Sequence, residues 1–330
     1  MASHLSGPRK ASYLLVVLAL FVAARFGLAP ALIGGLFASM VLDQSEQGLI
    51  AAGASKHVAR WSSVALFVVV GLLLAVVFAE FVRIGVERLP TLLDRLAPRL
   101  TALGDRFGVD LPVGNVSELH AAVIDAIKQN AKSVETFSGL LTREFFQLLL
   151  AFAIAILRFV SDTSPETGKG RGLDGEIVKE CRERASRFCA SFELVMGAQI
   201  MISAIYTVLA AIFLIGFRIP FRTMLTLTTF VCGLVPIVGN LISNSLIVGA
   251  ALTTSDNLAV AALVFLIVVH KGGYFLNSRI VGARMETPTW AILLGLLVGE
   301  ALMGVTGIIL APTVIHYVFA ELRAIPREAV

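Results

Sequence analysis

One carboxylate interrupts a long apolar stretch near the end of this 330-residue chain. Glu300 lies between the apolar residues 293–298 and 301–303, with no other charged side chain close to it in the sequence. In a membrane, an ionised carboxylate against lipid would cost about 2.5–3.5 kcal/mol, so this group must be protonated, paired or in contact with water. A carboxylate that takes up and releases a proton or a sodium ion suits an ion-coupled carrier. A carboxylate that bridges adjacent helices is the alternative.

A group of uncharged polar side chains follows helical spacing in the same half of the chain. Asn240, Ser243 and Asn244 share one helix face, and His270 and Asn277 share another at positions i and i+7. Asn carbonyl oxygens can hold a cation, and His exchanges a proton near neutral pH. These five residues are therefore candidates for an ion or solute pathway. Hydrogen bonding between helices is the alternative role for Asn240 and Asn244, and a place at the membrane interface is the alternative for His270.

Gln199 is a further candidate for this pathway, because it begins a polar stripe with Ser203 and Tyr206. The stripe lies within the apolar residues 193–217, and residues three or four apart share a helix face. Interhelical hydrogen bonds of this kind contribute about 0.6 kcal/mol each on average. We expect the stripe mainly to hold helices together.

The apolar stretch 221–252 contains residues that do not continue a helix. Pro236 has no backbone N–H, and Gly239 accepts conformations that other residues avoid. The arms on either side would each be about 22 Å long, which is shorter than the ~30 Å hydrocarbon core of a bilayer. We therefore predict a bent or re-entrant hairpin with its break at Pro236 and Gly239. A kinked, tilted helix is the alternative.

The stretch 289–319 raises the opposite problem, since it would be about 46 Å long as one straight helix. Gly304, Gly307 and Pro312 interrupt it. We predict two shorter arms, with these three residues as the helix-breaking positions. Irregular backbone at membrane depth is tolerated only where protein or a wet cavity surrounds it.

The composition is that of a membrane protein. Apolar residues make up 57% of the chain and charged residues 15%, whereas soluble domains hold about 45–50% and about 25%. The net charge of +4 includes no Lys/Arg block of the kind that binds nucleic acid. The three cysteines form no CxxC pair, and no P-loop or catalytic motif is present, so we expect no metal, no cofactor and no enzyme activity.

Hydrophobic windows predict an all-α polytopic membrane protein with about 6–8 transmembrane helices, two broken or re-entrant hairpins and an amphipathic helical insertion. Within residues 84–143, leucines from Leu89 to Leu103 follow helical spacing, residues 108–115 break it, and Leu119, Val123 and Ile127 restart it. This pattern predicts two amphipathic helices that lie on a membrane or pack on each other. Residues 161–192 include a charged helix with Glu and Arg at positions i and i+4, and this spacing predicts that one face of the helix is solvated. The expected organisation is N-terminal transmembrane helices in 1–83, the amphipathic extramembrane segment in 84–143, a transmembrane helix in 144–160, a cytoplasmic loop and the charged helix in 161–192, a transmembrane core with broken helices in 193–320 and a C-terminal tail in 321–330.

The distribution of Lys and Arg predicts the orientation in the membrane, since these residues concentrate in cytoplasmic loops. Arg9 and Lys10 place the N-terminus in the cytoplasm, and the spans that follow place residues 84–143 outside. The last broken stretch returns the C-terminus to the cytoplasm. Arg218 and Arg222 then fall on the outer side and violate the rule.

Several of these residues belong to an ordered set of short motifs. The motifs are Met196-Gly197-Ala198-Gln199, Gly233-Leu-Val-Pro236-Ile-Val-Gly239-Asn240, Tyr274-Phe-Leu-Asn277-Ser-Arg279-Ile-Val-Gly282 and Gly299-Glu300-Ala-Leu-Met-Gly304-Val-Thr-Gly307. In this order they resemble the AI-2E family of bacterial membrane proteins, named for export of the signal autoinducer-2. The resemblance is clearest over residues 176–322 and weakest over residues 84–143.

The resemblance implies a transporter of the bacterial inner membrane with cytoplasmic termini, assembled as a homo-oligomer with a pentamer as the implied number. It links the chain to export of autoinducer-2 and also to sodium/proton exchange. Asn277-Ser-Arg279 stands where many members carry an Asn/Glu-Pro pair, and Glu300 where many carry a small residue. These differences indicate a divergent branch.

We therefore expect a multi-pass secondary transporter that moves a small polar solute, Na⁺ or H⁺ across the lipid bilayer. Without a P-loop it must use an ion gradient. An oligomeric pore or channel would use the same polar stripes. A membrane scaffold without transport activity would use residues 84–143 as its working surface. The sequence leaves all three readings open.

Overall fold

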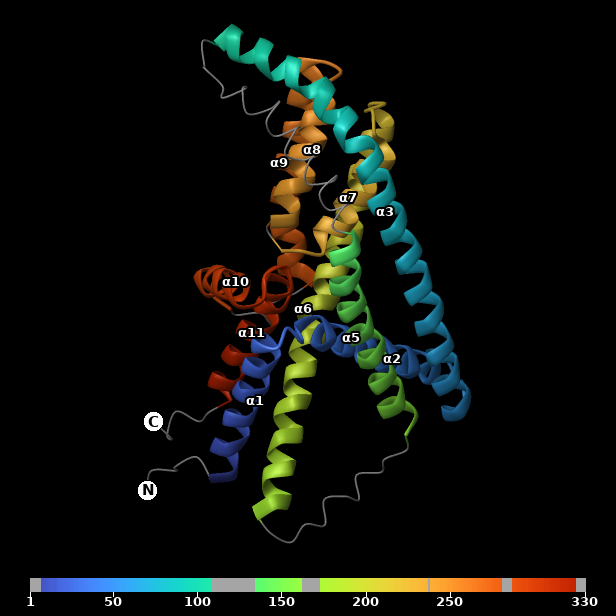
Figure 1. Ribbon diagram of the computed structural model, residues 1–330, viewed down its shortest axis with the longest axis vertical. Coiled ribbons are helices and arrows are strands. Elements are labelled where there is room, and N and C mark those ends of the chain that lie inside the picture. Colours follow the sequence, from blue (N-terminus) through green and yellow to red (C-terminus); the bar gives the residue numbers. More distant parts are fainter. Residues whose placement is uncertain (1–6, 108–133, 162–172, 237, 281–286, 325–330) are drawn as a thin grey trace. The chain divides into compact units, whose positions relative to one another are not determined.

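The computed structural model describes residues 7–107, 134–161, 173–236, 238–280 and 287–324, and every regular element within them is an α-helix (Figure 1). Helices α1, α3, α6 and α11 are long and apolar enough to cross a membrane, and α5, α8 and α10 hold shorter apolar stretches. The predicted all-α polytopic architecture is confirmed. The helices are α1 (Gly7–Arg25), α2 (Ala29–Ala51), α3 (Lys56–Phe107), α5 (Val134–Val160), α6 (Leu173–Gly216), α7 (Arg222–Gly233), α8 (Val238–Leu252), α9 (Asp256–Ile280), α10 (Thr289–Met303) and α11 (Val305–Arg323).

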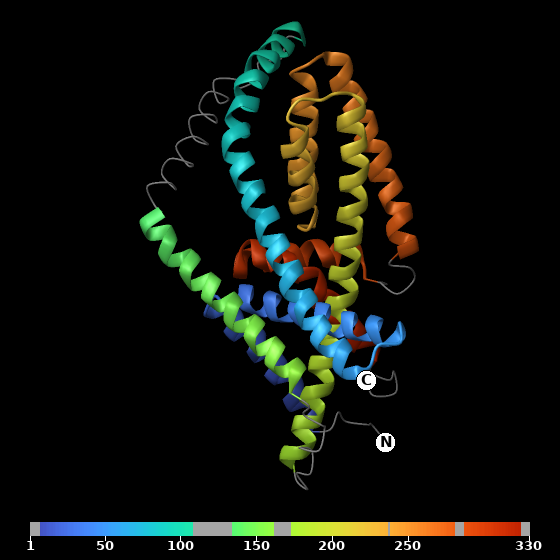
Figure 2. The same cartoon turned by 90° about the vertical axis from the view of Figure 1, so that its right-hand side faces the viewer.

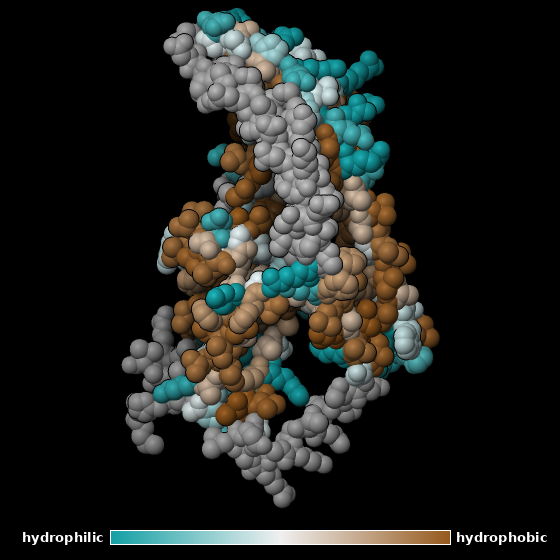
Figure 3. Space-filling model, viewed as in Figure 1, coloured by the Kyte–Doolittle hydropathy of each residue, from teal (hydrophilic) through white to brown (hydrophobic). Residues whose placement is uncertain are grey.

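Large apolar side chains are exposed along these helices, as the brown surface in Figure 3 shows. On α3, Leu72 is 64% exposed and Val76 is 66% exposed. A contiguous surface of this kind would drive association in water. In a bilayer the same side chains meet acyl chains, so the exposed apolar surface is that of a membrane protein.

The chain divides into two compact units, each built from separate stretches of sequence. The first unit contains Met1–Gly71, Thr142–Gly197 and Ala283–Val330, and the second contains Leu72–Leu141 and Ala198–Gly282. Helices α3 and α6 therefore contribute their N-terminal parts to the first unit and their C-terminal parts to the second. Within the second unit, α7, α8, α9 and the C-terminal part of α6 run side by side (Figure 2).

In the first unit, an N-terminal hairpin packs on other helices through small and aromatic residues. Gly27, with φ at +64°, turns the chain between α1 and α2. The rings of Phe67 on α3 and Phe152 on α5 meet edge to face, with their centroids 5.3 Å apart. Ala38 and Leu42 of α2 are buried in the same core, which fixes the hairpin against α3 and α5.

The C-terminal apolar stretch is broken once, at Gly304. Its φ of +60° and ψ of −141° end α10 and begin α11, and this conformation is open only to glycine. The two arms pack closely, because a β-carbon on Gly307 would overlap the carbonyl of Gly299. The prediction that Gly307 and Pro312 also break the helix is wrong, since both lie inside α11. Gly307 serves the close approach of two helices instead.

The stretch around Pro236 is also two helices, and the alternative of one kinked helix is wrong. Helices α7 and α8 have 12 and 15 residues, which corresponds to about 18 Å and about 22 Å. Each is shorter than the ~30 Å core of a bilayer. Gly239 lies in the first turn of α8, where a β-carbon would overlap the carbonyl of Cys232. The glycine is therefore needed for the close return of the chain.

The predicted extramembrane segment begins within α3, which continues through residues 83 and 84 and contains Pro90 and Pro98. The 52 residues of α3 would extend for about 78 Å, far beyond the thickness of a bilayer. Leu92 is fully buried in the core of the second unit, so this part of the segment packs on other helices rather than lying on a membrane. Leu119, Val123 and Ile127, which predict a second amphipathic helix, lie outside the described residues.

Candidate functional site

A small cavity lies beside the α7–α8 break in the second unit. Its volume is about 20 Å³, which is room for about one water molecule. All four helices that run together in this unit contribute to its wall. The lining consists of Tyr206 and Ala210 from α6, Thr229 from α7, Asn240, Ser243, Asn244 and Ile247 from α8, and Phe265, Leu266, Val269 and His270 from α9.

Four residues predicted for the pathway line this cavity together. Asn240, Ser243 and Asn244 come from the first two turns of α8, and His270 comes from α9. Ser243 is 1% exposed, and its hydroxyl donates to the carbonyl of Asn240 across 3.3 Å. Both asparagines are half-buried and His270 is exposed. The helical spacing of these residues thus gives one shared polar wall.

The polar atoms around the cavity are neutral oxygens and nitrogens. No carboxylate is among the lining residues, all of which are described. The Thr229 hydroxyl donates to the carbonyl of Leu225 across 2.8 Å and keeps its lone pairs free to accept. Thr229 was not predicted as a site residue. The only signal for it in the sequence is its position one turn before the break.

Gln199 and Ser203 bind the end of α7 and are not among the cavity-lining residues. The Gln199 amide donates to the carbonyl of Gly233 across 2.6 Å, and the Ser203 hydroxyl donates to the carbonyl of Phe230 across 2.8 Å. The last carbonyls of a helix have no partner within the helix. These two side chains therefore cap α7 and hold the break in place, which agrees with the expectation that the stripe joins helices.

Two other predicted residues lie apart from this set. Asn277 belongs to α9, but its side chain is outside the described part of the structure. Glu300 is exposed on α10 in the first unit, and no described residue forms an ion pair with its carboxylate. From the sequence we also expect Glu300 to share a cavity with Asn240, Asn244 and His270, and the break at Pro236 to pack against residues 299–312; both stay predictions.

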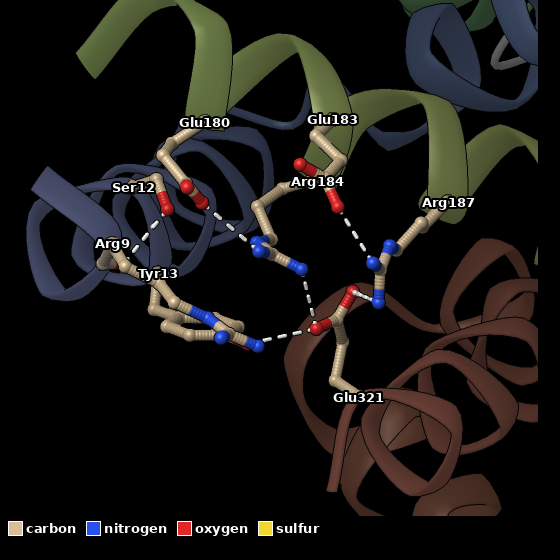
Figure 4. Close-up of polar contacts among 8 residues, drawn as sticks. All are labelled: Arg9, Ser12, Tyr13, Glu180, Glu183, Arg184, Arg187 and Glu321. Carbon is tan, nitrogen blue, oxygen red and sulfur yellow. Dashed lines mark hydrogen bonds and ion pairs between the residues drawn. The ribbon is translucent and has the colours of Figure 1, made fainter. Parts of the chain in front are cut away.

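A buried charged cluster in the first unit escaped prediction (Figure 4). Arg184 on α6 is 1% exposed and Glu321 on α11 is 5% exposed, and Nη1 of Arg184 lies 2.7 Å from Oε2 of Glu321. Tyr13 of α1 donates its hydroxyl to the same carboxylate oxygen across 2.7 Å. Arg184 also binds Glu180 across 3.0 Å. The charged helix is therefore not solvated on all sides, because distant parts of the chain cover this face.

The cluster joins three helices at one carboxylate. The guanidinium of Arg184 lies 4.9 Å from the ring centroid of Tyr13, and Arg187 lies 3.6 Å from the second oxygen of Glu321. A buried charge is tolerated only when it is paired and hydrogen-bonded. This arrangement gives Oε2 of Glu321 two hydrogen bonds, leaves Oε1 with only the 3.6 Å charge contact to Arg187, and ties α1 and α11 to α6. It has the character of a structural junction between these helices.

Comparison with known proteins assigns the chain to a family. A sequence model of the family described as AI-2E family transporter matches residues 11–327. No curated protein matches the chain. The match spans both units and includes residues 84–143, where the sequence motifs gave the weakest resemblance. It therefore confirms the family indicated by the motifs around Pro236, Asn277 and Gly304, and the protein belongs to the AI-2E family of transporters.

Proposed function

We propose that this protein is a secondary transporter of the bacterial inner membrane that exchanges Na⁺ for H⁺, with the cavity beside the α7–α8 break as its cation site. The observation that carries the proposal is the size and lining of that cavity. Export of a small polar solute is the second reading that family membership supports. A channel and a scaffold are the remaining alternatives. The flux experiment below distinguishes both from a transporter.

The volume of the cavity favours an ion over an organic solute. About 20 Å³ accommodates one water molecule or one dehydrated monovalent cation. Pockets for organic ligands are usually about 300–1,000 Å³. A solute the size of a sugar would need helices α8 and α9 to separate, whereas a cation needs no such movement.

The lining favours a monovalent cation. Asn240, Asn244 and Thr229 offer neutral oxygens, with no carboxylate to hold a divalent ion strongly. In many secondary transporters the ion site lies beside discontinuous helices, whose free carbonyls and polar side chains replace the hydration shell. The α7–α8 break provides such a discontinuity.

A proton can compete with the cation at this cavity through His270. A protonated imidazole carries a positive charge and donates from both ring nitrogens. A cation bound a few ångströms away would repel that charge in a medium of low dielectric constant. Binding of Na⁺ and protonation of His270 would therefore exclude each other, which is the requirement for exchange.

The distribution of charge and the family support a proposal for the wider arrangement. Both termini lie in the cytoplasm, and the α8–α9 turn at Thr254 lies outside. The protein assembles as a homo-oligomer in the lipid bilayer, with the pentamer that family resemblance suggests. Glu300, on the exposed face of α10, takes part in coupling flux to the ion gradient.

The test is flux from proteoliposomes with imposed gradients. The purified protein is reconstituted with a pH-sensitive dye inside, and an outward Na⁺ gradient is applied at constant membrane potential. The proposal predicts saturable, Na⁺-dependent proton uptake, which disappears when the Na⁺ gradient is absent. Non-saturating flux would identify a channel. Flux of a tritiated polar solute without Na⁺-dependent proton movement would identify solute export, and no flux at all would leave only the scaffold.

A further inference from the structure

A second and much larger cavity lies between α3 and the start of α7 in the second unit. Its volume is about 510 Å³, which is within the range of sites for small organic ligands. It is separate from the residues assigned to the cation site, with no lining residue in common. Four arginines line it, Arg83, Arg88 and Arg95 from α3 and Arg222 from α7.

The charges of these arginines are mostly unneutralised. Glu87 is the one carboxylate in the lining, and it lies 3.8 Å from Arg83, which also binds Glu80. Among the described residues, no carboxylate lies within ion-pair distance of Arg88, Arg95 or Arg222. Glu87 and Glu80 both pair with Arg83, so the charges of the other three arginines have no carboxylate partner among the described residues. Like charges gathered in this way repel one another unless an anion lies between them.

The N-terminus of α7 opens at the same cavity. Phe221 precedes the helix at φ +60° and provides no side-chain hydrogen bond to its first turn. The N–H groups of Arg222, Thr223 and Met224 therefore have no partner within the helix, and these three residues line the cavity. Free N–H groups and the positive end of the helix dipole favour an anion, above all a phosphate.

One of the arginines contacts an aromatic ring in the cavity wall. The guanidinium of Arg95 lies 5.6 Å from the ring centroid of Phe221, a distance at which a cation is attracted to an aromatic face. This contact places the guanidinium beside the residue that precedes α7, where its N–H groups can bind an anion. In Figure 3, hydrophilic side chains gather over the C-terminal part of α3, above the apolar stretch that precedes it.

Membrane topology gives an independent reason for a ligand. The distribution of Lys and Arg places the α6–α7 turn on the outer side of the membrane, where Arg222 violates the usual preference of arginine for cytoplasmic loops. Binding of an anionic ligand would explain why arginine lies on the side of the membrane where it is less common. We propose that this cavity binds a phosphate-bearing ligand at the outer face, either a soluble phosphomonoester or the headgroup of an anionic phospholipid.

Phosphate suits the cavity better than a single carboxylate does. A phosphomonoester carries about −1.5 to −2 charges at neutral pH and has three acceptor oxygens. Arginine binds such oxygens in pairs, and the N–H groups of the first turn of α7 supply further donors. The open volume leaves room for the glycerol or sugar that bears the phosphate. This site does not depend on the proposed cation exchange, because it is tested by binding.

The experiment compares two pairs of arginines in the full-length protein in neutral phosphatidylcholine nanodiscs. The double variant Arg95→Gln/Arg222→Gln removes two cavity charges. The control Arg99→Gln/Arg106→Gln removes two charges from α3 that do not line the cavity. Calorimetric titration with inorganic phosphate and with glycerol 3-phosphate tests a soluble ligand. Native mass spectrometry after addition of phosphatidic acid tests a lipid headgroup.

We expect the wild type to bind at least one of these probes and the cavity variant to bind it about tenfold more weakly or worse. The control should bind as the wild type does. Binding of phosphatidic acid without the soluble probes identifies a lipid site, and the reverse identifies a soluble ligand. Absence of binding to the wild type, or an equal loss in the control, overturns the proposal. Arg88→Gln alone, on the exposed surface of α3, serves if the double variant does not fold.

Discussion

Arg184 and Glu321 are 137 residues apart in the sequence, and in the structure Nη1 of one lies 2.7 Å from Oε2 of the other. Both side chains are buried, and Tyr13 donates to the same carboxylate oxygen. Three helices of the first unit therefore depend on one charge for their mutual position. Since removal of one partner leaves the other charged and buried, the pair should dominate the stability of this unit.

Arg184→Leu should lower the free energy of unfolding by about 3–5 kcal/mol, because Glu321 would be left buried without a guanidinium. The unfolding of detergent-solubilised protein can be followed with a thiol-reactive dye, since Cys181, Cys189 and Cys232 are partly buried and free. The double variant Arg184→Leu/Glu321→Leu should recover most of the loss. Arg158→Leu breaks an exposed pair with Asp43 and should cost less than about 1 kcal/mol. Equal effects of Arg184→Leu and Arg158→Leu would contradict this assignment.

Gly239→Ala should destabilise the α7–α8 break by about 1–3 kcal/mol, because the added β-carbon would overlap the carbonyl of Cys232. Gly272→Ala is the matched control, since nothing lies within 4 Å of a β-carbon there. The control should be neutral or slightly stabilising, because alanine favours a helix over glycine by about 1 kcal/mol. Unfolding midpoints of the two variants give the comparison. Equal unfolding midpoints of the two variants would mean that Gly239 does not lie close to the carbonyl of Cys232.

The orientation can be checked by cysteine labelling in a background without native cysteines. Thr254→Cys, in the exposed turn between α8 and α9, should react with a membrane-impermeant maleimide added to intact cells. Glu176→Cys, at the start of α6, should react only after permeabilisation. The opposite pattern would invert the topology and would place the arginine-lined cavity in the cytoplasm.

Glu300→Gln keeps the shape of the side chain and removes its charge. If Glu300 takes part in coupling beside His270, this variant should assemble normally and lose a measurable part of the pH dependence of transport, since no other carboxylate interrupts α10. Glu176→Gln, on the charged part of α6, should leave the pH profile unchanged. An unaltered profile in well-folded Glu300→Gln protein would reduce Glu300 to a residue with no part in coupling.

The two helix breaks illustrate what local sequence can predict. Pro236 lacks an N–H and Gly239 lacks a β-carbon, so residue chemistry predicts either a break or a kink here, and the structure has the break between α7 and α8. In the C-terminal stretch the same chemistry suggests three breaks, and only the one at Gly304 forms. Pro312 is accommodated within α11, and Gly307 is needed for contact with Gly299. Only the packing of α10 on α11 distinguishes these roles.

The residues of the two described polar sites also include some that local sequence predicts and some that it does not. Helical spacing alone predicts that Asn240, Ser243 and Asn244 share a face, and the cavity contains all three. Arg184 could not be assigned from its neighbours, because the i,i+4 pattern with Glu180 is equally typical of a solvated helix. Its burial depends on Glu321, at the far end of the chain. Long-range pairs of this kind leave no local signal.

The most direct test of the cation site is the dependence of proton flux on Na⁺ concentration in proteoliposomes. The double variant Asn240→Ala/Asn244→Ala removes two cavity amides, and Asn257→Ala removes an exposed amide from the first turn of α9. The account predicts that the double variant raises the KM for Na⁺ by about tenfold or more, while the control keeps the wild-type value. The same KM in the double variant and the control would contradict assignment of the cation to this cavity.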